Sequence, residues 1–191
     1  MNVLDIKTSI YENFSDFHFS KNFTLAESDF YDTFSKSFAE YSKDKLYVEL
    51  REYYNDDIAH FIIRNMVENK YIEPFESWSE IPLWYYNAFS FGGFINLNSH
   101  NLIYYLSGFM YVILSNNIDF NSNASILRWY DILNLTSYYV DEYLSKELNH
   151  NQLKTIALFL CYDPETEEID LSPPSADDDS IFAKFWYSFL K

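Results

Sequence analysis

Two carboxylate–histidine pairs are the residues of this chain whose types and spacing come closest to a chemical site. Asp57 precedes His60 by three positions, and Glu147 precedes His150 by the same interval. On a helix this spacing puts both side chains of a pair on one face, and di-iron bundles use two such Glu-x-x-His pairs with two further glutamates. A helical metalloenzyme with these four side chains as ligands is therefore one hypothesis for function.

The metal hypothesis is weakened by the residues themselves. One pair has Asp in place of Glu, and the other spans Leu148 and Asn149, where we expect a helix to break because Asn149 and Gln152 form a capping box. The chain has 29 acidic residues and four histidines, so pairs at this spacing are expected by chance. We therefore predict no metal site and no cofactor, and we interpret the four side chains as solvent-exposed groups.

The residues that could act as a nucleophile or as a general acid and base do not have the sequence surroundings that catalysis requires. Cys161 is the single cysteine and follows an apolar run, which is typical of a buried, inert thiol. Glu167 and Glu168 have the residue types of a catalytic acid and base, but a proline-containing segment does not hold carboxylates in fixed positions. With no serine-centred nucleophile motif either, we expect the protein not to be an enzyme.

Helical patterns dominate the elements that would position such residues. Thr24 and Glu27 have the spacing of a capping box, and Asn55 is suited to cap a second helix. Leu46–Tyr54 fits either a helix or a short strand. We predict helices over residues 25–42, 56–69, 82–91, 99–114, 126–148, 150–163 and 180–191.

The predicted helix over 99–114 is apolar nearly all round, which places it in the centre of the fold. Its apolar run from Leu102 to Leu114 is shorter than the roughly 20 residues that cross a bilayer. The terminal helix presents an aromatic face. That face either docks in the groove of another protein, as in an adaptor, or folds back onto its own core, which is the commoner arrangement.

Length and composition favour one mostly α-helical domain. The chain has 191 residues and only three glycines, too few for a phosphate-binding loop or a dinucleotide fingerprint. We predict a single-domain multi-helix bundle over residues 1–191, with a short strand near 46–54 as the one open alternative. Residues 163–179 hold eight acids, three of the five prolines and no base, and we interpret them as a solvated linker before the terminal helix.

The net charge of −16 bears on partners and location. An anionic surface repels nucleic acid phosphate and attracts a basic protein, so we expect a protein partner, no nucleic acid and no membrane. The first 19 residues carry charged side chains instead of an apolar signal-peptide core. We therefore expect a cytoplasmic protein, and we expect it to be a monomer.

Several aromatic and apolar motifs lie between Trp78 and Tyr162. They are Trp78-Ser79-Glu80-Ile81-Pro82, Phe89, Phe94, Tyr104-Tyr105-Leu106, Phe109-Met110, and a closing segment from Gln152 through Ile156 to Phe159-Leu160-Cys161-Tyr162. Over about Trp78–Tyr162 the chain thereby resembles a family of small acidic bacterial immunity proteins of polymorphic toxin and contact-dependent growth inhibition systems.

The resemblance implies a non-catalytic inhibitor that binds a cognate toxin domain. A basic nuclease is a suitable target, because an anionic protein surface can cover its phosphate-binding site. The acidic side chains are the candidate contact residues. The first group is Glu165, Glu167, Glu168, Asp177, Asp178 and Asp179. The second patch is Glu73, Glu76 and Glu80.

Overall fold

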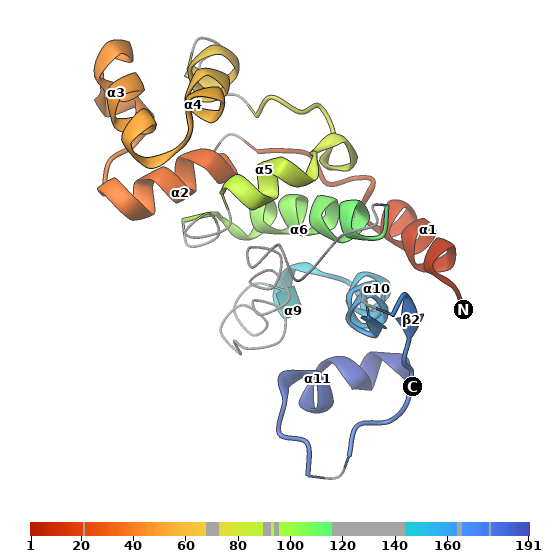
Figure 1. Cartoon of the computed structure of the whole chain (residues 1–191). Coiled ribbons are helices and arrows are strands. Elements are labelled where there is room, and N and C mark those ends of the chain that lie inside the picture. The colour runs from red at the N-terminus through yellow and green to blue at the C-terminus, as the bar shows by residue number, and fades with distance from the viewer. Residues whose placement is uncertain are drawn as a thin grey trace.

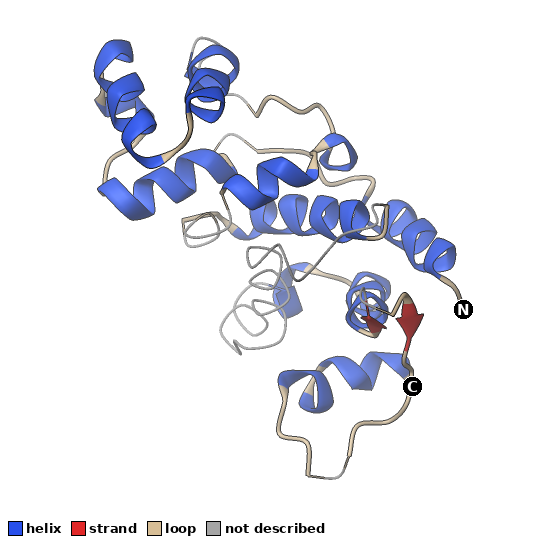
Figure 2. Ribbon diagram, in the orientation of Figure 1, coloured by secondary structure: helices blue, strands red, loops and turns tan. Residues whose placement is uncertain are grey.

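The computed structural model describes residues 1–20, 22–67, 73–89, 93, 96–115, 144–163, 166–175 and 177–191. Within these ranges the chain is mostly helical, and one short antiparallel pair of strands is present (Figures 1 and 2). The predicted mostly-α fold is confirmed. None of the described helices is both long and apolar enough to cross a membrane.

Helix α6 (Ser99–Ile113) runs through the middle of the described fold. Every residue from Asn101 to Met110 is buried, so the prediction of a central helix is confirmed. The Asn98 side chain caps the first turn, as the sequence indicated. Helices α2 (Leu25–Phe34) and α5 (Leu83–Ala88) lie along one side of α6, and α10 (His150–Leu160) lies on the other (Figure 1).

Helix α1 (Val3–Phe14) packs against both α6 and α10 and was not predicted from the sequence. Its N-terminus has a reciprocal capping box between Asn2 and Asp5. Ile6 and Ile10, one helical turn apart, are fully buried. Both signals are present in the sequence, which could therefore have predicted this helix.

The predicted helix over 25–42 is wrong beyond Phe34. Ser35 takes the left-handed conformation, with φ of 53°, and ends α2 there. A short 3₁₀ turn (Phe38–Glu40) follows before α3 begins at Lys43. The helical spacing of Phe30, Phe38 and Tyr41 thus spans α2 and the residues that follow it. The rings of Phe38 and Tyr41 still pack against Phe30.

The alternative of a strand near 46–54 is also wrong, because α3 (Lys43–Tyr53) covers these residues. Leu46 and Leu50 are fully buried while Val48 between them is exposed. The apolar positions that face the core are therefore four residues apart, a helical spacing. Helix α4 (Asp56–Ile62) follows, capped by Asn55 as predicted.

The segment before α5 differs from the prediction. Helix α4 continues as one π turn (Ile63–Val67), and a 3₁₀ turn (Trp78–Glu80) precedes α5. The helix predicted to start at residue 82 begins at Leu83, with Pro82 as the residue before it, and Ser77 caps the preceding 3₁₀ turn. The proline forces this arrangement, because it disfavours helical backbone at the residue that precedes it.

The predicted break between two late helices is confirmed. Helix α9 (Ser145–Glu147) ends at Leu148, whose backbone is extended, and a capping box of Asn149 with Gln152 starts α10. The earlier part of the predicted helix over 126–148 lies outside the described residues.

The predicted linker contains an element. Strand β1 (Tyr162–Asp163) pairs antiparallel with β2 (Glu168–Ile169), and Glu167 between them has a φ of 58°. The prediction of an element-free linker is therefore wrong at its start. Asp170, the residue after β2, also donates its amide to the Cys161 carbonyl oxygen at 2.8 Å. Because Cys161 is the C-cap of α10, this bond joins the hairpin to the end of that helix.

The C-terminus folds back onto α10. The predicted terminal helix is two short elements, α11 (Ile181–Lys184, capped by Ser180) and a 3₁₀ helix (Trp186–Leu190), with a break at Phe185. The 3₁₀ helix packs on α10, and Trp186 is fully buried. The aromatic face that an adaptor would present to a partner is thus in contact with the same chain.

We predict that Trp186→Ala lowers the free energy of unfolding by about 3–5 kcal/mol, because it leaves a large cavity beside α10. Urea unfolding followed by circular dichroism measures the change, with Val48→Ala, at an exposed helical position, as the control. A Trp186→Ala protein as stable as the wild type would instead favour the adaptor.

Close packing between α6 and the 3₁₀ turn before α5 depends on Gly108. A Cβ atom there would lie 2.4 Å from the Trp78 carbonyl oxygen and 2.2 Å from the Tyr86 hydroxyl. Gly→Ala inside a helix normally stabilises by about 0.5–1 kcal/mol. We expect Gly108→Ala to reverse that sign and to lower the free energy of unfolding by about 1–3 kcal/mol. Unfolding in urea tests this, and any gain in stability would contradict the close approach.

Candidate functional site

The fold does not bring the four residues of the metal hypothesis together. Asp57 and His60 lie on α4, whereas Glu147 and His150 lie at the junction of α9 and α10 on the other side of α6 (Figure 1). The Glu147 carboxylate accepts a hydrogen bond from the Ser99 hydroxyl at 3.1 Å. Among the described residues, no group of three or more His, Cys, Asp and Glu side chains could hold a metal ion.

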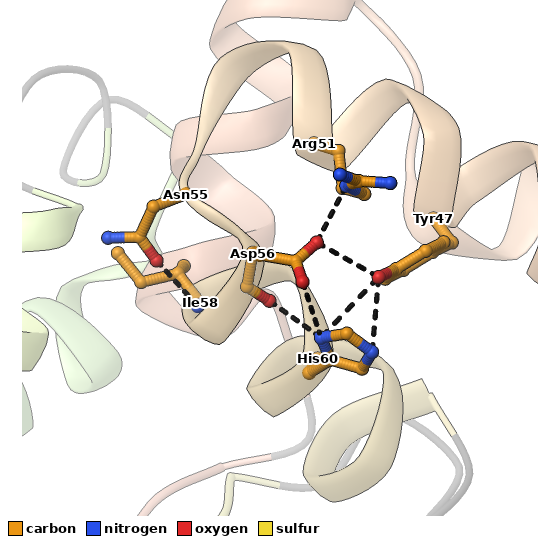
Figure 3. A network of polar contacts seen from close by, with 6 residues as sticks. All are labelled: Tyr47, Arg51, Asn55, Asp56, Ile58 and His60. Carbon is orange, nitrogen blue, oxygen red and sulfur yellow. Dashed lines mark hydrogen bonds and ion pairs between the residues drawn. The ribbon is translucent and has the colours of Figure 1, made fainter.

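His60 instead belongs to a polar network that joins α3 to α4 (Figure 3). The Asp56 carboxylate lies 2.6 Å from Nε of Arg51 and accepts a hydrogen bond from the Tyr47 hydroxyl at 3.0 Å. The His60 ring contacts the Asp56 backbone oxygen at 2.8 Å and the Tyr47 hydroxyl at 3.1 Å. Arg51, Asp56 and His60 are more than half exposed, so this network adds little to the stability of the fold.

A pocket of about 530 Å³ opens between α4 and α5. Its wall is aromatic: the rings of Phe61 and Trp84 meet edge to face at 5.0 Å, and Trp84 is 42% exposed. Exposed Asp57 lines the same pocket. Among the residues that the structure describes, the lining is Asn55, Asp57, Ile58, Phe61, Trp84, Asn87 and Ala88.

Sequence reasoning missed this pocket because it depends on two helices that are 20 residues apart in the chain. Asp57 was considered only as a metal ligand, and Trp84 was not considered at all. A volume of this size with apolar walls and a few polar groups is typical of a binding pocket.

A second pocket, of about 260 Å³, lies on the other side of α4. Its lining is Lys43, Asp44, Tyr47, His60, Ile63 and Arg64. Among the described lining residues, this pocket has Lys43 and Arg64 with one carboxylate, Asp44, whereas the pocket between α4 and α5 has Asp57 and no basic side chain. Helix α4 therefore separates two sites of different electrostatic character.

The acids of the predicted linker are exposed wherever the structure describes them. Glu167 and Glu168 are at the hairpin, and residues 177–179 precede α11. Glu165 lies outside the described residues. Asp178 accepts a hydrogen bond from the Ser180 backbone amide at 2.8 Å, which lowers the pKa of that carboxyl, and Asp179 pairs with Lys184 at 2.9 Å.

The second predicted acidic patch needs a correction. Glu76 and Glu80 are exposed, but Glu73 is only 6% exposed and cannot offer its carboxyl to a partner. Two helices supply its hydrogen bonds: the hydroxyl groups of Tyr105 on α6 and Tyr85 on α5 both donate to its Oε2. The Tyr105 oxygen also accepts the backbone amide of Leu25 at the start of α2, at 2.9 Å.

Burial raises the pKa of Glu73 to about 8, although the hydrogen bonds from Tyr105 and Tyr85 oppose the rise. Burial likewise raises the pKa of Glu27 to about 7, against a backbone hydrogen bond from Phe38. Glu73 is therefore mainly protonated at neutral pH. It acts as a neutral member of the core and adds little to the negative surface.

Cys161 is buried, as predicted, at the C-terminal cap of α10. Burial, with a smaller effect of Asp170, raises the pKa of its thiol to about 11. The thiolate is the nucleophilic form, so this environment suppresses its reactivity.

Comparisons of the chain with protein-family models, with curated proteins and with solved structures found no match.

We expect the stability of the fold to decrease with pH because of Glu73. Its folded pKa of about 8 lies above the ordinary 4.5, so the native state holds a proton that the unfolded chain releases. The contribution of this bound proton to the free energy of unfolding is complete below pH 4.5 and is lost as pH rises through 8. Glu73→Gln should flatten the decline in unfolding free energy between pH 5 and 8, and Glu27 should leave a residual slope.

Urea unfolding at a series of pH values measures this slope. Glu76→Gln, an exposed neighbour, is the matched control and should leave the slope unchanged. Equal slopes for Glu73→Gln and the wild type would show that Glu73 is ionised inside the fold.

Proposed function

We propose that this protein is a cytoplasmic immunity protein, which neutralises a basic toxin domain by covering its surface and performs no catalysis. The observation that carries the proposal is an acidic loop held at both ends on α10. The hairpin of β1 and β2 anchors its start, and the C-terminal 3₁₀ helix anchors its end. Residues 170–175 and 177–180 extend away from the helices between these anchors (Figure 1).

Anchoring makes this loop more effective than a free acidic tail. The segment from Asp163 to Asp179 carries eight acids and no base, and its ends cannot drift from the surface of α10. A concentrated negative field accelerates the approach of a cationic partner and favours one docking orientation. A toxin nuclease has the required positive surface, because it must bind phosphates.

Co-expression is the direct experiment. The gene is expressed with the C-terminal domain of any large exported protein that is encoded immediately upstream, and survival of the cells is measured. We expect protection together with a stable complex of the two purified proteins. Death of the cells despite expression of both proteins would refute this function for that pair.

We predict that neutralising the loop slows association with the toxin more than neutralising the same number of acids elsewhere. The loop variant replaces five acids by their amides: Glu167, Glu168, Asp177, Asp178 and Asp179. The control variant replaces five dispersed, exposed acids: Glu12, Asp16, Asp32, Asp44 and Glu52. Stopped-flow measurements at low salt should give an association rate about tenfold lower for the loop variant than for the control.

The difference should shrink as salt is added, because mobile ions screen the field. Equal association rates for the two variants would show that only the total charge matters and that the loop has no special position.

A further inference from the structure

We propose that the pocket between α4 and α5 receives an arginine side chain of the protein partner. The inference rests on the proposed function and names the part of the surface that provides specific contacts. Three observations support it: the aromatic wall, the electrostatic contrast with the second pocket, and the rigid support beneath both helices.

The aromatic wall suits a planar cation. Trp84 has a large exposed fraction for an indole, and the edge-to-face contact with Phe61 holds its ring in place. A guanidinium group is attracted to the face of a tryptophan, and it stacks there more readily than an ammonium group does. Exposed tryptophans in pockets are also frequent energetic centres of protein interfaces.

The charges select a cation over a neutral apolar group. Among the described residues, no ion pair or hydrogen bond engages the Asp57 side chain, and no basic side chain lines its pocket. A guanidinium group can form paired hydrogen bonds with such a carboxylate. The pocket on the other side of α4 has Lys43 and Arg64 in its lining against the single carboxylate of Asp44, so its net positive charge disfavours a cation.

The support beneath the pocket preorganises it. Tyr85 and Tyr86 follow Trp84 on α5 and are fully buried, so the helix cannot rotate without exposing them. On α4, the Asn55 side chain caps the first turn by accepting the Ile58 amide at 2.9 Å, and Asp56 ties that turn to α3 (Figure 3). A partner residue that enters the pocket therefore meets groups already in position, which reduces the entropy lost on binding.

The first experiment uses the isolated protein and a small probe. N-acetyl-arginine-methylamide is titrated into ¹⁵N-labelled protein, and the indole N–H signals of the four tryptophans are followed by NMR. Trp84→Phe assigns the Trp84 signal. We expect this signal to shift at millimolar probe concentrations while that of buried Trp186 stays unchanged.

Two further probes distinguish an arginine side chain from a neutral or a non-planar cationic one. N-acetyl-citrulline-methylamide has the same shape without the charge, and the lysine derivative has the charge without the planar group. A shift for arginine that exceeds both supports the proposal, and Asp57→Asn should abolish the preference over citrulline. Equal shifts with the citrulline and arginine probes would show that the pocket does not select a charge and would overturn the proposal. Equal shifts with the lysine and arginine probes would overturn the preference for a planar cation. No shift with any probe would show that the pocket binds none of these side chains.

The second experiment uses the toxin domain. Trp84→Ala should weaken the complex at least about tenfold, mainly through faster dissociation, and Trp84→Phe should weaken it less because an aromatic face remains. Tyr11→Ala, which removes an exposed aromatic ring from α1 outside the pocket, is the matched control and should bind like the wild type. Thermal unfolding of each variant verifies that the fold is intact.

The two proposals fail in different ways. A wild-type protein that neither protects cells nor binds the toxin overturns the proposed function, and the probe titration then decides the pocket by itself. A wild-type protein that protects, with Trp84→Ala binding equally well, overturns the pocket and leaves the function standing.

Discussion

Burial of α6 from Asn101 to Met110 is the constraint on which the rest of the structure depends. The helix carries polar groups into the core, and each must find a hydrogen-bond partner there. Asn101 accepts bonds from the Ser20 amide and hydroxyl and donates to the backbone oxygens of Ser20 and Phe23. The segment before α2 is thereby fixed on α6, and the hydroxyl of Tyr105 holds the first residue of α2 in the same way.

The same constraint determines how the candidate pocket is presented. Helix α5 buries Tyr85 and Tyr86 towards α6, so the neighbouring Trp84 must point to the outer side. Helix α4 lies across from it and completes the pocket with Phe61 and Asp57. The binding surface is thus a consequence of core packing, because the residues that hold α5 in place are adjacent in sequence to the one that lines the pocket.

Two populations of acidic residues follow from the fold and behave differently. Glu27 and Glu73 are enclosed by helices, and burial raises the pKa of each carboxyl towards or above neutral pH. The acids of the loop between β2 and α11 face water. The formal charge of −16 counts both populations equally, whereas the field that a partner meets arises from the exposed acids alone.

Local patterns in the sequence determined the helical class, the central helix and most of the helix starts. Side chains such as Asn55, Asn98 and Asn149 cap helices by contacts within three residues, so their effect can be predicted without a partner from elsewhere. Tertiary structure decided the burial of Glu73 and the meeting of Phe61 with Trp84. Each of these depends on contacts between segments distant in the chain, and the spacing of residues along one segment carries no information about them.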